Sequence, residues 1–364
     1  MTQNPVRILH VITGMGSGGA EMFLMNMYRN MDHDRVVFDF VLQSDENIYR
    51  DELLSYGSKI YRIEPYFKHY FKNHAQLKEI LRSGYSIVHV HGNALLYITP
   101  LLYAKRMGIP CRIMHSHNTS MYYKWALPYH VLNKHRLRHA ASHRFACSDA
   151  AGKWMFFDDF TVIENAIDLD AFSFREESRI RVREELGIPQ NAFVIGQVGR
   201  LTAVKNQQFS MKVFSEVLLS RPDSRLLFIG TGSMEKEMKE IASSMGIGEK
   251  VLFLGARKDV SRLQNAMDLF IFPSLYEGLG IVAIEAQANG LPVYCSNAIP
   301  DEALIGENIH RLSLEAGVDA WAKEILQADL NRRDNQDRLR EAGYDIRYEA
   351  KKLQEFYLSV GNRE

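Results

Sequence analysis

Two carboxylates, Glu277 and Glu285, flank a glycine-rich turn in the stretch SLYEGLGIVAIEAQANG. Gly278 and Gly280 allow the turn, and the apolar residues that follow are typical of a helix. The N–H groups from Leu279 to Ile281 would then point out of the helix start, which favours a bound phosphate. Because carboxylates repel phosphates, we expect both glutamates to accept hydrogen bonds from sugar or ribose hydroxyls beside it. The alternative, a solvated loop acid and an ordinary helix residue, leaves both glycines unexplained.

Two cations, Arg200 and Lys205, lie in the stretch GQVGRLTAVKNQQ, directly after a predicted strand, and Gly199 allows the chain to turn there. Arg binds phosphate oxygens through a fork of N–H donors and Lys binds them as a point charge, so the two suit a diphosphate. Surface loops often carry such cations without a ligand. The two cations therefore indicate a diphosphate site only when they are considered together with the glutamate stretch.

A glycine cluster, ITGMGSGGAE, follows the first predicted strand, and Gly14, Gly16 and Gly19 fit the pattern GxGxxG. In dinucleotide-binding proteins this pattern comes with an acidic residue about 20 positions later, at the end of the next strand. Asp45 is the candidate, since Asp39 falls in the middle of a strand. The other interpretations are a purely structural turn and a loop that brings its backbone close to a ligand.

Histidines end two predicted strands, in HVH (89–91) and HSH (115–117). Residues two apart on a strand share one face, so each pair projects to the same side of the sheet. A zinc site is one interpretation, although the pattern of a third ligand is absent. We expect instead histidines that are hydrogen bonded in the core or that face a ligand.

The elements that position these residues follow a β-α-β order. In the first half, short runs rich in β-branched residues alternate with longer amphipathic segments, and the runs are VRILHVIT, VVFDFVLQ, KIYRI, SIVHVHG, CRIMHSH, HRFACS and TVIENA. After a polar piece from about Asp168 to Asn191, the order restarts with FVIGQVGR, RLLFIGTG, KVLFLGA, DLFIFPS and PVYCS. This alternation predicts an α/β protein with two doubly wound parallel sheets, whose ligands bind at the carboxyl ends of the strands. We expect the two sheets to face a central cleft.

The predicted domains cover 1–170 and 171–344. The last segment, about 345–364, is expected to be a helix that packs back on the first domain. Tyr348, Leu353, Phe356 and Tyr357 are available for its apolar face.

The composition excludes several classes of protein. The chain has 364 residues, 46% hydrophobic and 24% charged, and its 44 Lys and Arg balance 44 Asp and Glu. No overall basic field favours nucleic acid. We see no secretory signal, no apolar run of the length that spans a bilayer, and three scattered cysteines without a CxxC pair. We therefore expect a cytoplasmic protein.

The motifs together resemble the retaining glycosyltransferases of family 4, which have the GT-B fold. The resemblance rests on Gly199-Arg200, Lys205, Gly230-Thr231-Gly232 and above all EGLGIVAIE, which fits the E-x7-E signature of that family. It extends from the GSGGAE loop to VIENAIDLDAF at the junction of the halves, where Ala166 departs from the glycine that the family often has. HSHN and SLYEGLG are most similar to bacterial enzymes of capsular or extracellular polysaccharide synthesis.

The resemblance implies a role for each catalytic candidate. Arg200 and Lys205 would neutralise the donor's diphosphate and stabilise it as it departs. Glu277 would hold hydroxyls of the donor sugar. A histidine would lie beside that sugar, His117 in the preferred alignment and His115 in the alternative register, and could hydrogen-bond the sugar or accept the acceptor's proton.

The resemblance also implies a larger set of donor contacts. Glu285 would hold the ribose, and the strand end from Phe253 to Ala256 would line the base. The full set is Gly16, Gly18, Gly19, Gly199, Gly230, Phe253, Leu254, Gly255, Gly278, Leu279, Gly280, Ile281 and Glu285. No DxD motif follows a strand of the second half, and many family members work without a bound metal. We therefore expect no metal and no cofactor, because the two cations can take the place of a metal.

Basic and aromatic residues are interleaved in YYKWALPYHVLNKHRLRHAASHR (122–144). Such a segment can rest on an anionic membrane surface, and a solvated helix face is the alternative. Enzymes of the resembled kind take lipid-linked acceptors, which favours peripheral contact with the inner face of the cell membrane.

The sequence thus predicts a retaining hexosyltransferase. Its donor would be a nucleotide diphosphate sugar, UDP-linked by resemblance, and its partner an acceptor glycan or lipid-linked glycan rather than nucleic acid. The alternatives are a nucleotide-sugar epimerase or phosphorylase-like enzyme of similar fold, an NAD-dependent oxidoreductase built on the first glycine cluster, and a sugar-nucleotide binding protein without activity.

Overall fold

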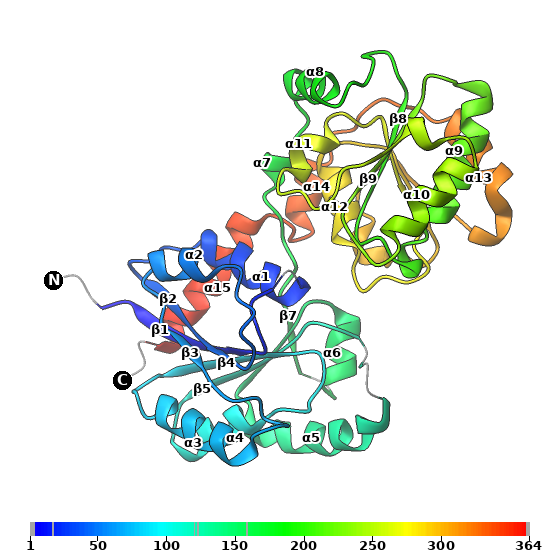
Figure 1. Cartoon of the computed structure of the whole chain (residues 1–364). Helices are drawn as coiled ribbons and strands as arrows, with labels where there is room; N and C mark the ends of the chain where they lie inside the picture. Colours follow the sequence, from blue (N-terminus) through cyan, green and yellow to red (C-terminus); the bar gives the residue numbers. More distant parts are fainter. Residues whose placement is uncertain (1–3, 17, 120, 122–123, 158, 362–364) are drawn as a thin grey trace. The chain divides into compact units, whose positions relative to one another are not determined.

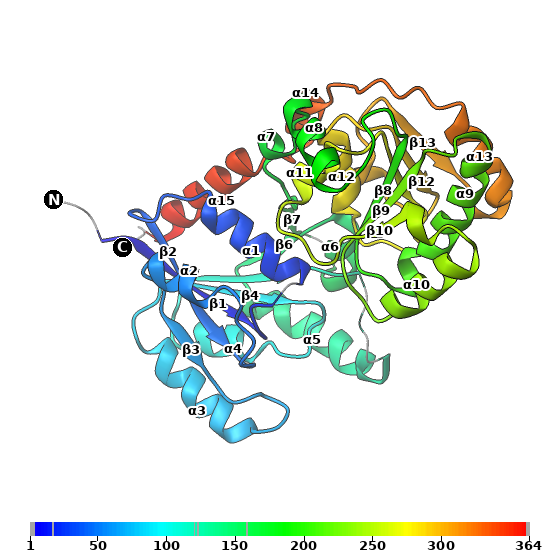
Figure 2. The same ribbon diagram turned by 45° about the horizontal axis from the view of Figure 1, so that its top comes forward.

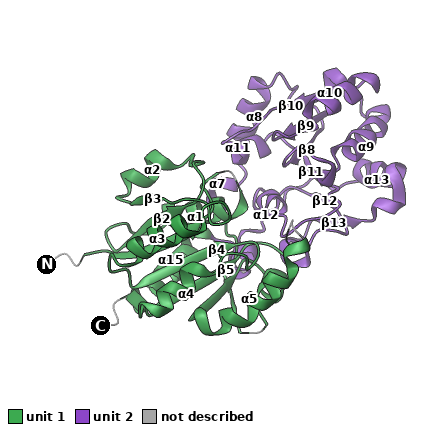
Figure 3. Ribbon diagram, turned by 60° about the horizontal axis from the view of Figure 1, so that its bottom comes forward, with its two compact units in different colours: residues 1–166, 346–364 green, residues 167–345 purple. Residues whose placement is uncertain are grey.

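The protein is described by a computed structural model that covers residues 4–16, 18–119, 121, 124–157 and 159–361. The chain forms two compact units, which Figure 3 shows in different colours. The first comprises Met1–Ala166 and Ile346–Glu364, and the second comprises Ile167–Asp345. The chain leaves the first unit once and returns to it for its last helix.

A sheet of parallel strands forms the centre of the first unit (Figure 1). Its strand order is β3-β2-β1-β4-β5-β6-β7. Its strands are β1 (Val6–Ile12), β2 (Val36–Leu42), β3 (Ile60–Arg62), β4 (Ile87–Gly92), β5 (Cys111–Ser116), β6 (His143–Ala146) and β7 (Thr161–Val162). Each lies within one of the runs that the sequence predicts. The strand order reverses between β1 and β4, and at such a point the carboxyl ends of the strands leave room for a ligand.

Two helical layers cover this sheet, because side chains alternate along each strand. On β1, Ile8 and Ile12 belong to the core with α1, α2 and α15, whereas Leu9 and Val11 belong to the core with α3 to α6. The helices are α1 (Gly19–Arg29), α2 (Arg50–Ser55), α3 (Tyr70–Leu81), α4 (Thr99–Arg106), α5 (Leu127–Ala140), α6 (Asp149–Met155) and α15 (Ile346–Gly361). Strands buried on both faces explain the nearly continuous apolar runs in the sequence.

The last helix, α15, packs beside α1 and against β1, β2 and β4 (Figure 2). Leu353 and Tyr357 are buried there, and the Gln354 side chain accepts a 2.6 Å hydrogen bond from the Asp32 N–H. The prediction that Tyr348 belongs to the apolar face is wrong, since this residue is 65% exposed. At about 100° per residue, Tyr348 falls well off the stripe that Leu353 and Tyr357 share.

The second unit has its own parallel sheet, in the order β10-β9-β8-β11-β12-β13, which reverses between β8 and β11. Its strands are β8 (Val194–Val198), β9 (Arg225–Ile229), β10 (Val251–Phe253), β11 (Leu269–Phe272), β12 (Val293–Ser296) and β13 (Ile309–Leu312). The sequence prediction missed β13. That strand lies at the sheet edge and carries a histidine and an arginine, so it shows neither an apolar run nor strict alternation.

Helices cover both faces of the second sheet as well. They are α7 (Leu169–Phe172), α8 (Glu176–Glu185), α9 (Gln207–Ser220), α10 (Glu235–Ser244), α11 (Val260–Gln264), α12 (Ile281–Ala288), α13 (Gly317–Leu326) and α14 (Gln336–Glu341). One core gathers α7, α8, α11, α12 and α14, and the other gathers α9, α10 and α13 around Phe214 and Trp321.

Candidate active site

The two loops with the predicted catalytic residues meet at the reversal point of the second sheet. One loop follows β8 and the other follows β11, which are neighbouring parallel strands. The Leu275 N–H donates to the Val204 carbonyl over 2.8 Å, and the Asn206 side chain donates to the Pro273 carbonyl over 3.1 Å. Hydrogen bonds therefore fasten the two loops to each other.

Lys205 and Glu277 form an ion pair between these loops. Lys205 Nζ lies 2.6 Å from Glu277 Oε1, and the two side chains are 22% and 9% exposed. The same ammonium lies 5.3 Å from the centroid of the Phe272 ring, within the range of a cation–π contact. Both charges are thus largely withdrawn from water, and no local sequence pattern indicates that they pair with each other.

Two buried polar side chains hold the backbone at Lys205. Gln197 on β8 donates to the Lys205 carbonyl over 2.7 Å and accepts a 2.7 Å hydrogen bond from the Ser210 hydroxyl. Gln197 and Ser210 are each 1% exposed. Sequence reasoning missed both, although a glutamine inside the apolar run VIGQV was a usable signal, since a buried amide requires partners.

Arg200 lies on the same loop as Lys205 and is exposed. Its carbonyl accepts a 2.8 Å hydrogen bond from Gln207, which anchors the backbone. No described residue forms an ion pair with its guanidinium. The guanidinium can therefore turn toward the oxygens of a ligand.

The N-terminus of α12 carries the predicted anion site. The helix begins after Gly280, whose φ of 85° lies in the left-handed region that favours glycine. No side chain caps this helix start, so its first N–H groups are unsatisfied by the helix itself. The Leu279 side chain is buried in the core, which anchors the loop. This arrangement fits a phosphate at the helix start.

Glycines also line the ends of β8, β9 and β10. A Cβ at Gly230 would lie 2.1 Å from the Gly199 carbonyl oxygen, so only glycine allows these backbones to approach. The Gly230 N–H donates to the Gly255 carbonyl over 2.8 Å. Phe253 and Leu254 are partly exposed at the end of β10, two strands away from β8 on the same sheet edge.

Glu285 lies one turn inside α12 and is partly buried. No described residue gives its carboxyl group a hydrogen bond or an ion pair. Burial raises the pKa of Glu285 to about 8. The group is therefore mostly protonated at neutral pH, and a ligand that donates hydrogen bonds to it would favour loss of that proton.

In the first unit, the glycine cluster forms the connection between β1 and α1. A Cβ at Gly14 or Gly16 would lie 2.3 Å from a side-chain oxygen of the loop 44–46, so both have a packing reason to be glycine. Gly18 is the N-cap of α1. A Cβ at Gly19 would meet nothing within 4 Å, so packing does not explain that glycine.

The acidic residues considered for a dinucleotide are engaged elsewhere. Asp39 is fully buried in β2, where it accepts hydrogen bonds from Arg7 over 2.8 Å and from the Tyr85 hydroxyl over 2.7 Å. Asp45 forms an ion pair of 2.6 Å with Arg62. Burial removes Asp39 as a ribose ligand, whereas the Asp45 side chain is 89% exposed and stays accessible despite its ion pair.

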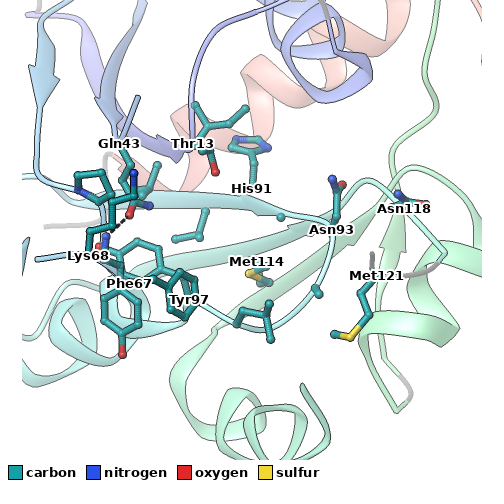
Figure 4. Close-up of a pocket in the computed structure, with 18 residues that line it drawn as sticks. Thr13, Gln43, Phe67, Lys68, His91, Asn93, Tyr97, Met114, Asn118 and Met121 are labelled. Carbon is teal, nitrogen blue, oxygen red and sulfur yellow. Dashed lines mark hydrogen bonds between the residues drawn. The ribbon is translucent and has the colours of Figure 1, made fainter. Parts of the chain in front are cut away.

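A pocket of about 560 Å³ opens at the reversal point of the first sheet. Figure 4 shows Thr13 and His91 on one side of it and Phe67 and Tyr97 on another. Asn93 adds an amide after the end of β4. Aromatic faces together with a few polar groups suit a sugar ring, which has both apolar and hydroxyl-bearing surfaces.

The two histidines that the sequence left as alternatives differ in burial. His115 is fully buried, whereas His117 is partly exposed just past the end of β5. Both belong to a cluster with His89, His91 and His10, of which the sequence had not indicated His10. Two triplets of this cluster, His10 with His89 and His91 and His91 with His115 and His117, each have one nitrogen per ring within 4.8 Å of the others.

The segment 122–144 forms a 3-10 turn (Lys124–Ala126) and α5, while Tyr122 and Tyr123 lie outside the described residues. Trp125 and Tyr129 are 74% and 62% exposed.

Several of the segment's cations contact the protein itself. Lys134 donates to two backbone carbonyls of α6, and Arg144 pairs with Asp159 at 3.2 Å. Arg138 lies 5.7 Å from the centroid of the Phe157 ring. These three charges are therefore less available to a membrane than the sequence suggests.

Two families of sequences match this chain. Residues 17–171 match the family described as Glycosyltransferase Family 4, and residues 178–346 match the family described as Glycosyl transferases group 1. EpsF of Bacillus subtilis (strain 168), a glycosyltransferase by designation, is 32% identical over 380 residues, which cover 100% of this chain and 98% of EpsF. The chain belongs to glycosyltransferase family 4. The family resemblance predicted from the motifs is thereby confirmed.

Further relatives of this family 4 glycosyltransferase agree. A UDP-Gal:alpha-D-GlcNAc-diphosphoundecaprenol alpha-1,3-galactosyltransferase of Escherichia coli is 25% identical over 69% of this chain and 68% of its own length. The crystal structure of Anabaena HepE in complex with UDP superposes with a TM-score of 0.78 at 18% identity, covering 97% of this chain and 100% of HepE. A glycosyltransferase from Rickettsia africae superposes with a TM-score of 0.79 at 19% identity, covering both chains fully. The predicted GT-B fold of two parallel-sheet units is confirmed.

None of the helices in the described part of the enzyme combines the length and apolar character that a bilayer-spanning helix requires.

Proposed function

We propose that this glycosyltransferase moves a hexose-type sugar from a UDP-sugar to a hydroxyl of a lipid-linked glycan, with retention of anomeric configuration, in capsular or extracellular polysaccharide synthesis. The Lys205–Glu277 pair beside the uncapped start of α12 carries the proposal. The donor is supported by HepE, which has been crystallised with UDP and with UDP-glucose. The acceptor class is supported by the Escherichia coli relative, whose name includes a diphosphoundecaprenol-linked sugar.

The second unit would bind the donor through three kinds of contact. Lys205 and Arg200 meet the oxygens of the diphosphate, and the N–H groups at the start of α12 meet its distal phosphate. Glu277 accepts hydrogen bonds from the sugar's hydroxyls, and Glu285 accepts them from the ribose. The ends of β8 to β10, with Phe253 and its neighbours, line the base.

The reaction breaks the bond between the anomeric carbon and the phosphate oxygen. The bonding electrons stay on the departing diphosphate, and the cations stabilise the charge that develops there. The acceptor oxygen forms its bond on the same face of the sugar, and its proton passes late to an oxygen of the departing phosphate. The products are UDP and the extended glycan.

The pocket of the first unit is proposed to hold the acceptor glycan. Tyr66, Phe67 and Leu96 line both this pocket and a second pocket of about 880 Å³, whose other walls include Trp125 and Tyr129. A pocket of aromatic faces with a few polar groups that shares walls with a more apolar one suits a molecule with a sugar end and a lipid end. We place this face of the first unit at the inner surface of the cell membrane.

Liposome co-sedimentation tests the membrane contact. Replacement of Trp125 and Tyr129 by Ser removes exposed aromatic area and should reduce binding to vesicles that contain anionic lipid. Phe71→Ser is the matched control, because Phe71 is 85% exposed on α3 and does not line the apolar pocket. Equal sedimentation of the double variant and the parent contradicts the contact.

A panel of nucleotide sugars tests the donor and the reaction. The true donor should raise the thermal stability, since a ligand at many times its dissociation constant adds about 2 to 4 kcal/mol. UDP release that requires an acceptor and yields a glycoside supports transfer. Sugar inversion without an acceptor would indicate an epimerase, a requirement for phosphate would indicate a phosphorylase, and NADH fluorescence on binding would indicate an oxidoreductase.

A further inference from the structure

Five histidines lie together inside the first unit, on or just after β1, β4 and β5. Strand register places His10 beside His89, and His91 beside His115. All project from the sheet face that α1 and α15 cover, because they share the parity of residues such as Ile8 and Ile113 in that core. His10, His89 and His115 are fully buried and His91 is 8% exposed. Each ring carries two nitrogens that require partners.

Three of the rings form a hydrogen-bonded series, which we name the edge row: His10, His91 and His117. His10 Nδ1 lies 2.9 Å from His91 Nε2, and His91 Nδ1 lies 2.8 Å from His117 Nε2. The planes of successive rings differ by 22° and 29°. Both nitrogens of His91 are therefore committed to its two neighbours.

A second series, the inner row, consists of Tyr357, His89 and His115. The Tyr357 hydroxyl lies 2.8 Å from His89 Nδ1, and His89 Nε2 lies 3.2 Å from His115 Nδ1. The inner row stacks on the edge row, with ring centroids 4.2 Å apart between His89 and His91 and between His115 and His117. No hydrogen bond among the described residues joins the two rows.

This geometry favours hydrogen bonding over metal binding. Zinc ligands surround the ion tetrahedrally at about 2.0 to 2.1 Å, so their ring planes converge on one point. Here His89 and His91 are stacked with planes only 23° apart, as are His115 and His117 with 25°. Stacked rings direct their lone pairs along parallel planes rather than toward a shared centre.

Burial keeps the edge row uncharged. It lowers the pKa of His10 and of His117 to about 3, and it holds the pKa of His91 well below the usual value. Each ring therefore carries one hydrogen at neutral pH. Since the rings are linked end to end, the tautomer of one ring fixes the tautomer of the next.

The two ends of the edge row lie in different surroundings. His10 Nε2 has no partner among the described residues, and the ring lies in the core with its centroid 4.1 Å from that of Phe38. His117 Nδ1 also has no partner among the described residues and is itself buried, but the His117 ring, unlike that of His10, is partly exposed at the sheet edge where ligands bind. A buried N–H without a partner is rarer in proteins than a bare acceptor. The hydrogen therefore belongs at the His117 end.

We propose that the edge row runs in one direction, from His10 through His91 to His117. His10 Nδ1–H donates to His91 Nε2, and His91 Nδ1–H donates to His117 Nε2. His117 then carries its own hydrogen on Nδ1, at the end of the row that lies nearest the sheet edge.

The consequence for catalysis rests on the proposed function. With its Nε2 lone pair occupied by His91, His117 can offer a sugar only a hydrogen-bond donor, on Nδ1, and cannot accept the acceptor's proton. His10 becomes a positioning residue that acts only through His117, whereas His91 positions His117 and also lines the pocket proposed for the acceptor.

Nitrogen-15 NMR of protein with labelled histidine tests the direction without any activity measurement. A protonated and an unprotonated ring nitrogen have well-separated chemical shifts. At pH 7 we expect His10, His91 and His117 all to carry hydrogen on Nδ1. A hydrogen on Nε2 of His117, or a mixture of both forms, overturns the proposal.

Variants at position 91 test the coupling. His91→Asn keeps an N–H donor near the position of Nδ1 and should leave the His117 tautomer unchanged, whereas His91→Leu removes the donor and should release His117 into the other form. His89→Asn is the matched control, because it alters the inner row on the same strand. If His117 keeps one tautomer in His91→Leu, the coupling is wrong; if that variant does not fold, the unmodified protein still decides the direction.

Two further measurements separate the possible outcomes. The first is the metal content of the purified protein. One equivalent of metal that is lost in His91→Leu would show that the histidines form a metal site, and it would overturn the proposed hydrogen-bonded row. With the true donor, kcat/KM should fall about tenfold in His91→Leu and stay within about threefold in His91→Asn, the weight of one hydrogen bond. If the tautomers are as expected but the protein transfers no sugar, only the proposed function is wrong. If the protein transfers sugar but His117 carries its hydrogen on Nε2, only the proposed direction of the edge row is wrong.

Discussion

Lys205 Nζ lies 2.6 Å from Glu277 Oε1, across the reversal point of the second sheet. A donor would exchange this contact for two others, with Lys205 moving to a phosphate and Glu277 to a hydroxyl. Each side chain holds the other in place before the donor binds, so the geometry of the site does not depend on ligand contacts. The pair thus contributes to the stability of the unit as well as to the proposed chemistry.

Alanine at position 205 should therefore lower both stability and rate. It leaves Glu277 only 9% exposed and without its cation, and we expect a loss of about 1 to 3 kcal/mol in the free energy of unfolding. The transfer rate should fall by about 10² to 10³, as for other groups that stabilise developing charge. Urea unfolding and initial rates of UDP release measure the two effects.

Arg200→Ala provides the comparison. Arg200 is exposed, so its loss should change the free energy of unfolding by no more than about 0.5 kcal/mol. The transfer rate of Arg200→Ala should nonetheless fall by a factor similar to that expected for the alanine variant of Lys205. Near-parental rates in either variant contradict the catalytic roles.

Glu285 should make donor binding depend on pH. Its pKa is raised to about 8, and ribose hydroxyls that donate to it favour the ionised form. Binding of UDP should then release a proton at pH 7, and affinity should rise by up to about tenfold per pH unit up to pH 8. Calorimetry in buffers of different ionisation enthalpy measures the proton. Glu285→Gln should remove this release, and an unchanged release would assign it to another group.

The same residue should lower stability as the pH rises from about 4.5 to about 8. Between the usual value of 4.5 and about 8, the folded chain holds the Glu285 proton and the unfolded chain does not. The free energy of unfolding therefore falls as pH rises through this window. Glu285→Gln should unfold at nearly the parental temperature at pH 5 and at a higher temperature at pH 8.5. A constant difference would contradict the raised pKa.

Gly278 and Gly280 should respond differently to alanine. A Cβ at Gly278 meets nothing within 4 Å, whereas Gly280 has a φ of 85° and a Cβ there would lie 3.2 Å from the Phe272 ring. Gly280→Ala should lower the free energy of unfolding by about 1 to 2 kcal/mol, and Gly278→Ala should not. If Gly278 borders the donor, its variant should weaken UDP binding in a folded protein. Unchanged UDP affinity in Gly278→Ala would leave that glycine without a ligand role.

Gln197→Leu should disturb Lys205 from a distance. The variant leaves the Lys205 carbonyl and the buried Ser210 hydroxyl without this partner, at a cost of about 1 to 3 kcal/mol in stability. The double variant with Ser210→Ala should regain part of that loss, because it removes one of the stranded groups. Purely additive effects would show that the two side chains act independently.

The sequence was most informative where local pattern and buried surface agree. The strands could be predicted because parallel strands that are covered on both faces need apolar residues at nearly every position. The half-exposed edge strand β13 lacks that requirement and was missed. Gly280 and the start of α12 were predictable because a tight turn before a helix has a strong local signature.

Contacts between distant residues were not predictable in the same way. Nothing local to Lys205 or Glu277 says that they meet, since that contact depends on β8 and β11 being neighbours in the sheet. His10 looked like a single polar residue in an apolar strand until the register placed it beside β4. Tyr348 looked apolar enough for the core, but the angle around α15 decided otherwise.

The return of the chain for α15 has a consequence for synthesis on the ribosome. Residues Ile167–Asp345 form a contiguous unit that can complete its core as soon as it emerges. The first unit lacks Leu353 and Tyr357, both buried in its core, until the last segment is made. The half that is translated first is therefore the half that finishes folding last, and a chain that stops near residue 345 would carry a folded second unit behind an incomplete first one.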